Sequence, residues 1–206
     1  MLLIENQYFP SINYYLTLLN CSNIKIVEYE FFKKSTFRNR CIITGSSGPI
    51  SLSVPIKNGR NQKALFRDVE ISYQEDWQTR HWRSLLACYS RSPFFEYYQQ
   101  NLHALFFLKE KYLFDYNLKI QEKMAAILKI DLPSCLTLQP QPGETCTDLR
   151  DMCTPQNFRD TKMPGKYVQV FIGKTGFIPN LSILDLVFNV GPEAIAYLKS
   201  ENFKSF

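Results

Sequence analysis

Short apolar runs and one helical period alternate at the start of the chain. Residues 2–4 and 24–27 are brief apolar runs that predict strands. Between them, Pro10 precedes residues 11–19, whose apolar side chains recur at helical spacing. A strand that follows a strand and a helix most simply lies parallel to the first strand. The pattern therefore predicts an opening β-α-β unit.

A β-hairpin is predicted next. Residues 40–44 and 50–56 are β-prone, and the second run alternates apolar and polar side chains. The sequence Gly-Ser-Ser-Gly-Pro at 45–49 between them is typical of a turn. Residues 69–71 also alternate, after a basic connection at 57–63, and predict a short edge strand. We therefore expect a mixed sheet.

Helical spacing dominates from residue 75 onward. Trp77, His81 and Leu85 share one face, and two acids open the first turn, where the helix dipole favours them. Residues 94–108 and 112–128 carry apolar side chains three and four apart and predict two further helices. The predicted fold class is α/β, with a mixed sheet that starts with a β-α-β unit and a hairpin and is covered by several helices.

The region 133–166 differs from the rest of the chain. Its five prolines stand among polar residues, which predicts a long loop with at most a short helical turn. Such a loop would serve as a lid or as a tether. Residues 167–172 then predict a strand, and two helices are expected, one from about residue 182 and one that starts at Pro192. We expect a single domain over residues 1–206.

The composition and the start of the chain exclude several classes of protein. The first residues lack the basic flank and the long apolar run of a secretory signal. The longest later apolar stretches fall far short of the roughly 20 residues that cross a bilayer. Six cysteines without a CxxC pair and two histidines do not give the spacing of a zinc site, so reduced thiols are expected. We therefore expect a cytoplasmic protein with no membrane span and no metal site.

Charge is distributed unevenly along the chain. The formal net charge is +5, but the segment from Lys33 to Arg91 has eleven Lys and Arg against four acids, an excess of +7. Such an excess points to an anionic ligand or surface, with a solvated basic face as the alternative. Nucleic acid is disfavoured, because the excess is modest and no binding-fold signature accompanies it.

The basic stretch 33–40 supplies the candidate anion-binding residues. Lys34, Arg38, Asn39 and Arg40 stand just before a predicted strand, and the planar fork of donors on arginine suits a phosphate or a carboxylate. An ordinary charged connection is the alternative. If the stretch is extended, Arg38 and Arg40 point to one side and Asn39 to the other.

A histidine, two tryptophans and an amide complete the candidate site. His81 shares a helix face with Trp77, which favours either an acid, base or ligand donor or a satisfied core histidine. Trp77 or Trp82 would stack on a base or a sugar face. Asn117 stands among large apolar residues, as a site residue or as a buried polar group that needs a partner. No GxGxxG, Walker A, GxSxG or HExxH signature occurs, so the reaction and any cofactor stay unidentified.

Seven motifs along the chain, each weak alone, occur in one order. They are Tyr8-Phe9-Pro10, Phe37-Arg38-Asn39-Arg40-Cys41-Ile42, Leu52-Ser53-Val54-Pro55-Ile56, Trp77 with His81-Trp82, Tyr89 with Ser92-Pro93-Phe94-Phe95-Glu96-Tyr97-Tyr98, Leu113-Phe114-Asp115-Tyr116-Asn117, and Asn180-Leu181-Ser182-Ile183-Leu184-Asp185-Leu186 with Gly191-Pro192. In this order they resemble the WbqC-like protein family, in the version common in Bacteroidetes, essentially end to end. Many relatives begin with a His-Gln-Pro-like strand end, where this chain has Ile4-Glu5-Asn6, so no role for that histidine carries over.

The resemblance implies a pathway rather than a reaction. The family is linked mainly to gene clusters for O-antigen and other surface polysaccharides. Arg38, Asn39, Arg40, Trp77 and His81 stand where the family pattern has them. A purely structural pattern would favour apolar residues and glycine, so this polar set is a candidate site.

These observations support a leading hypothesis and a rival. The leading one is a transferase that acts on a nucleotide-activated or otherwise phosphorylated sugar, with Arg38 and Arg40 holding the anion and His81 as general acid or base. The rival is a non-catalytic binding or assembly protein of the polysaccharide machinery, which would hold a partner through exposed aromatics and the loop 133–166. Convergence of Arg38, Arg40 and His81 on one cleft would favour the enzyme, and their spread over separate faces would count against it. Substrate, donor and oligomeric state stay open.

Overall fold

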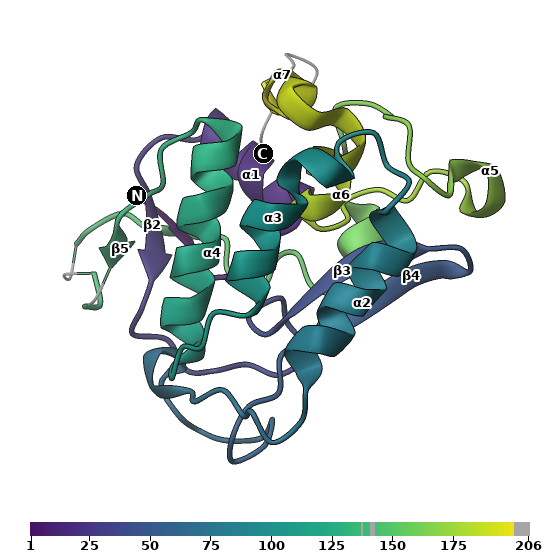
Figure 1. The fold of residues 1–206 in the computed structure, drawn as a ribbon. Coiled ribbons are helices and arrows are strands. Elements are labelled where there is room, and N and C mark those ends of the chain that lie inside the picture. Colours follow the sequence, from purple (N-terminus) through teal and green to yellow (C-terminus); the bar gives the residue numbers. More distant parts are fainter. Residues whose placement is uncertain (137, 141–142, 200–206) are drawn as a thin grey trace.

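The fold contains two separate sheets, as seen in a computed structural model that describes residues 1–136, 138–140 and 143–199 (Figure 1). Positions 137, 141 and 142 of the predicted loop, and residues 200–206, lie outside the described residues. The first sheet is parallel, in the order β5-β2-β1-β6, and the second is the antiparallel pair β3-β4. The α/β class is therefore confirmed, with the parallel and antiparallel pairings in different sheets.

The opening β-α-β unit is confirmed. Strand β1 (Leu2–Ile4) leads through helix α1 (Ile12–Asn20) to strand β2 (Ile24–Val27), which pairs with β1 in parallel. Ile4 lies opposite Ile26, and both side chains are buried. Burial of these apolar residues against α1 and the later helices holds the unit in place.

The Pro-rich region supplies both edges of the parallel sheet. Strand β5 (Cys135–Leu136) pairs with β2, and strand β6 (Thr147–Asp148) pairs with β1. Each strand has two residues, which is too short to show a period of two in the sequence. The prediction of a loop therefore missed a segment that reaches from one edge of the sheet to the other.

The predicted hairpin is confirmed as β3 (Arg40–Gly45) and β4 (Gly48–Ser53). The predicted edge strand at 69–71 is wrong, because Glu70 and Ile71 each form a single isolated bridge after the short 3-10 helix η1 (Phe66–Asp68). Bridges to two different segments, at Ile56 and Tyr112, do not build a ladder.

Three helices follow at the predicted places, namely α2 (Trp77–Tyr89), α3 (Phe95–Phe106) and α4 (Leu113–Leu128). The side chain of Asp76 caps α2 by accepting a hydrogen bond from the backbone N–H of Thr79. Helix α2 lies along the hairpin, and α3 packs against α2 (Figure 1). None of the helices in the described part of the chain is long and apolar enough to cross a membrane.

The C-terminal part is mostly helical. After the 3-10 turn η2 (Phe158–Asp160) come α5 (Ile172–Thr175), α6 (Ile183–Val190), η3 (Gly191–Glu193) and α7 (Ala194–Leu198). The two predicted helices are therefore confirmed, but the predicted strand at 167–172 is wrong. Tyr167 and Gln169 are buried and donate hydrogen bonds to the carboxylate of Asp185, at 2.5 and 3.1 Å. Side-chain bonding to one carboxylate replaces strand pairing here.

We predict that Asp185 makes folding stability fall as pH rises. Burial raises the pKa of this carboxyl from 3.8 to about 6, against three donors that lower it. Between pH 3.8 and about 6 the folded protein therefore keeps a proton on Asp185 that the unfolded chain has lost. The stabilisation from this proton is present in acid and is lost as pH rises through 6. Relative to Asp185→Asn, the wild type should lose about 2 kcal/mol of unfolding free energy between pH 4 and 7. Urea titrations at both pH values measure this difference, and a constant difference would contradict the prediction.

Candidate functional site

A cavity of about 420 Å³ lies where strands β1 and β6 end. Its wall includes Ile4, Glu5 and Gln7 at the end of β1, and Leu149 and Cys153 just after β6. The chain leaves β1 through α1 toward β2 on one side, whereas β6 lies on the other side of β1. In parallel sheets, ligands bind at the carboxyl ends of the strands where the connections diverge in this way. The cavity has the position of an α/β ligand site.

Three residues on the cavity wall carry polar atoms without a partner. Gln7 Oε1, Ser11 Oγ and Asn13 Oδ1 are buried and form no hydrogen bond with any part of the chain that the structure describes. Gln7 and Ser11 are 3% and 2% exposed. Buried polar groups are nearly always paired in native proteins. Three such atoms on one cavity make it the candidate site.

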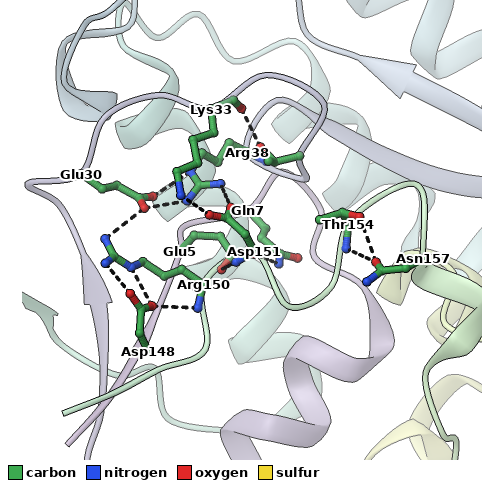
Figure 2. Close-up of polar contacts among 11 residues, drawn as sticks. Glu5, Gln7, Glu30, Lys33, Arg38, Asp148, Arg150, Asp151, Thr154 and Asn157 are labelled. Carbon is green, nitrogen blue, oxygen red and sulfur yellow. Dashed lines mark hydrogen bonds and ion pairs between the residues drawn. The ribbon is translucent and has the colours of Figure 1, made fainter.

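Glu5 is the carboxyl group buried in this wall. Gln7 Nε2 donates to Glu5 Oε1 at 2.6 Å, and the backbone N–H of Asp151 donates to Oε2 at 3.3 Å (Figure 2). Burial raises the pKa of Glu5, whereas the positive charge of Arg38 and the bond from Gln7 oppose the rise. The carboxyl group therefore holds a proton more readily than an exposed glutamate.

A buried ion-pair network lies behind Glu5 (Figure 2). The Arg38 side chain is fully buried and donates from Nε and Nη2 to the two oxygens of Glu30, at 2.8 and 2.6 Å. Its Nη1 donates to Asp151 Oδ1 at 2.5 Å, and Lys33 binds the other oxygen of Asp151 at 2.5 Å. Although burial acts in the opposite sense, these two cations hold the pKa of Asp151 below its ordinary value. Arg38 thus fastens the segment after β6 to the N-terminal half of the chain.

Cys153 brings a thiol to the cavity, but not a reactive thiolate. Its Sγ accepts a hydrogen bond from Asn180 Nδ2 at 3.1 Å and lies 3.9 Å from Thr161 Oγ1. Burial raises the pKa of the thiol, so the neutral form dominates at neutral pH. Ser11 lies close enough to the sulfur to lower this pKa slightly, without a hydrogen bond of normal geometry.

Only residues 36–39 of the predicted basic stretch are buried, and they lie in the interior and not on the cavity wall. Residues 37–39 form a turn rather than an extended segment. Arg38 and Asn39 are both buried, Asn39 Nδ2 donates to the carbonyl of Val54, and Asn117 Nδ2 donates to the carbonyl of Arg38. The structure therefore brings Arg38, Asn39 and Asn117 together as supports of the hairpin.

The two other predicted cations are placed apart from this group. Lys34 is exposed and binds Asn61 Oδ1 at 2.9 Å. Arg40 is half-buried, and burial together with the charge of Arg60 lowers its pKa. Its Nε has no hydrogen-bond partner in the described ranges.

The predicted histidine and tryptophans lie in the helical part of the core. His81 Nδ1 is 3.0 Å from Tyr8 Oη, and its ring lies edge-on to Trp77 with centroids 5.1 Å apart. Burial lowers the pKa of His81 to about 4, so the ring is neutral at pH 7. Trp82 packs between α2 and α3 against His103 and Phe106. None of the eight predicted residues lines the cavity, and their role in a reaction stays a prediction.

Sequence reasoning missed the residues on the cavity wall. Glu5, Gln7, Ser11 and Asn13 follow the first predicted strand and open the first predicted helix. That position was itself a usable signal, because the carboxyl end of a parallel strand is the usual ligand site. No comparable signal marks Cys153, which is brought to the site by the irregular segment after β6.

Comparison with known proteins assigns the family. The model of the WbqC-like protein family matches residues 6–160. The chain belongs to the WbqC-like protein family. No curated protein and no solved structure matches it. The part of the WbqC-like chain that matches contains α1, the hairpin, β6 and Cys153. The match therefore covers most of the cavity wall.

Nothing in the described ranges of this WbqC-like protein forms a group of three or more His, Cys, Asp and Glu that could hold a metal ion. A second depression of about 350 Å³ lies between the hairpin tip and α5, with Arg159 and Lys174 on its wall. Its cations are exposed, and it has no buried unpartnered atom on its wall among the described residues. The cavity at β1 and β6 is the better-built site.

We predict that Arg38 of this WbqC-like protein carries much of its folding stability. Arg38→Met leaves the buried Glu30 carboxylate without its main partner, which typically costs about 3–5 kcal/mol. Lys33→Met removes the other cation on Asp151, but Lys33 is 60% exposed, so its loss should cost at most about 1 kcal/mol. Urea titrations measure the unfolding free energies of the two variants. Equal losses of unfolding free energy in Arg38→Met and Lys33→Met would contradict the prediction.

Proposed function

We propose that this protein is an enzyme of surface polysaccharide biosynthesis in the cytoplasm, and that it transfers a group to or from a nucleotide-activated or phosphorylated sugar. The cavity at the ends of β1 and β6 is the proposed substrate site. The pathway rests on the WbqC-like resemblance and on family membership over residues 6–160. The site rests on the three buried polar atoms that lack a partner in the described chain.

The shape of the cavity supports binding of a small molecule. About 420 Å³ lies within the usual range for such sites. Apolar side chains, such as Ile4 and Leu149, make up part of its wall, and a few polar groups stand between them. This is the composition of a site that surrounds an organic ligand and orients it by a few hydrogen bonds.

In this proposal Arg38 is a positioning residue. Its guanidinium is occupied by Glu30 and Asp151, which argues against direct contact with a substrate phosphate. Arg38 affects the cavity in two ways. Its charge opposes the rise in the pKa of Glu5, and its bond to Asp151 holds the segment that closes one side of the cavity.

Binding is tested with a panel of nucleotide sugars, sugar 1-phosphates and free nucleotides. A true ligand should raise the melting temperature of the protein, because it binds the folded state. Met152 lines the cavity and is 50% exposed, so Met152→Trp should obstruct the cavity and weaken calorimetric affinity at least tenfold. Val168→Trp is the control, because Val168 is 76% exposed and does not line the cavity.

Absence of any hit, or equal weakening by both tryptophan variants, would contradict the substrate site. Binding without turnover of any panel member would favour the rival, a binding protein of the polysaccharide machinery. That rival predicts a protein partner in a pull-down from cells that make the polysaccharide.

The proposed acid or base role of His81 has its own test. His81 is held by Tyr8, the residue that follows Gln7 in the chain. If His81 moves a proton, His81→Gln should lower turnover of the identified substrate at least 100-fold while its binding affinity stays within threefold. Arg83→Gln is the control on the same helix, since Arg83 is exposed and does not line the cavity. Full turnover in His81→Gln would remove the histidine from the mechanism.

A further inference from the structure

The cavity wall offers hydrogen-bond acceptors. The amide of Gln7 is oriented by its own bond, because Nε2 donates to Glu5 Oε1 at 2.6 Å. That bond leaves Oε1 as an acceptor without a partner in the described chain. Asn13 Oδ1 is likewise buried and unpartnered there, and each carboxylate oxygen of Glu5 can accept more than one bond. Ser11 Oγ, the third unpartnered atom, can donate as well as accept. A ligand that completes this wall therefore brings mainly donors.

The nearby cations and amides are already occupied. Arg38 binds Glu30 and Asp151, and Arg150 binds Asp148 at 2.6 Å. The first amides of α1 are also used, since Ile12 N–H donates to the Leu181 carbonyl at 2.9 Å and Asn13 N–H donates to Asn180 Oδ1 at 2.8 Å. A buried phosphate needs free donors of these kinds. The wall therefore offers an anion the Ser11 hydroxyl, but no free cation or backbone amide among these groups.

Lys162 is the exception on the wall. It is exposed to solvent, and its neighbour Thr161 belongs to the segment after η2 that forms one side of the cavity. An exposed lysine holds a phosphate as a point charge at the surface, where both stay hydrated. Lys162 is therefore the group that can meet the negative charge of a ligand, at the exposed mouth of the cavity, where the carboxylate of Asp160 also lies.

Apolar and aromatic groups form another part of the wall, beside polar residues such as Ser11, Thr17 and Asn157. Ile4, Leu149 and the ring of Tyr14 line the cavity, and Tyr14 donates its hydroxyl to Gln121 Oε1 at 3.1 Å. Because the hydroxyl of Tyr14 is occupied, its ring is the part that can contact a ligand in the cavity. A sugar ring has C–H groups that pack on such surfaces and hydroxyl groups that donate to acceptors.

We propose that the cavity holds the uncharged ring of a sugar through its hydroxyl groups, which donate to Gln7 Oε1, Asn13 Oδ1 and Glu5, while any phosphate stays at the mouth beside Lys162. This inference rests on the proposed function and deepens it by assigning the two parts of the substrate to two places. The specificity would come from acceptors, so the number and orientation of ring hydroxyls decide which sugar binds.

The test compares two kinds of probe on the purified full chain. The neutral probes are methyl glycosides of glucose, galactose and N-acetylglucosamine, and the charged probes are inorganic pyrophosphate and a nucleoside diphosphate. Calorimetry measures the affinity of each, together with that of the nucleotide sugar found in the screen. We expect at least one glycoside to bind and Met152→Trp to abolish its binding, whereas pyrophosphate should be insensitive to Met152→Trp.

Two acceptor variants test the contacts directly. Asn13→Leu and Gln7→Met keep the size of the side chain and remove the acceptor, and each should weaken glycoside and nucleotide sugar five- to tenfold. Asn20→Leu is the matched control on the same helix, since Asn20 is exposed and does not line the cavity. Lys162→Ala should weaken the nucleotide sugar and leave the glycoside unchanged. Melting curves show whether each variant folds. If Gln7→Met does not fold, Asn13→Leu alone tests the acceptor contacts.

The possible outcomes distinguish a failure of this inference from a failure of the proposed function. If neither nucleotide sugars nor glycosides bind, the proposed function fails. If a nucleotide sugar binds and Met152→Trp weakens it, but both acceptor variants bind normally, the site stands and the acceptor inference is overturned. Binding of the nucleoside diphosphate that is lost in the two acceptor variants would also overturn it, because the charged part would then occupy the interior.

Discussion

The buried guanidinium of Arg38 is the interaction on which the site depends. Removing a charge from water is costly unless oppositely charged and hydrogen-bonding groups surround it. Glu30, in the segment after β2, accepts two hydrogen bonds from this guanidinium. Asp151, in the segment after β6, accepts a third. The need to satisfy one cation therefore ties together parts of the chain that are far apart in sequence.

The cavity is the space left between these tied segments. Its floor is the end of β1, where Glu5 accepts a bond from the backbone of Asp151, and one side is the segment that Asp151 anchors. The opposite side is the start of α1, held by bonds to Asn180 and Leu181. Packing and ion pairing thus fix the walls of the candidate site and leave three buried polar atoms on them unpaired in the described chain.

Much of the fold follows from local pattern, and much of the site does not. Helices α2, α3 and α4 and the hairpin were predictable because their apolar periods run over many residues. Strands β5 and β6 were not, since two residues cannot show a period, and the polar side chains of Tyr167 and Gln169 overrode a strand-like sequence by bonding to Asp185. Arg38 was correctly predicted to bind carboxylates or phosphates. Its partner Asp151 lies 113 positions away in the sequence, so only the fold shows that the charge of Arg38 is already neutralised.

The pairing of β1 with β6 has a consequence for how the protein is made. Leu2 and Leu3 of β1 pair with Thr147 and Asp148 of β6, which are far from them along the chain. During synthesis β1 must therefore keep one edge open until β6 has emerged. Such distant pairing slows folding and leaves an unpaired edge exposed meanwhile. A chain cut short before residue 147 would therefore carry an unfinished sheet.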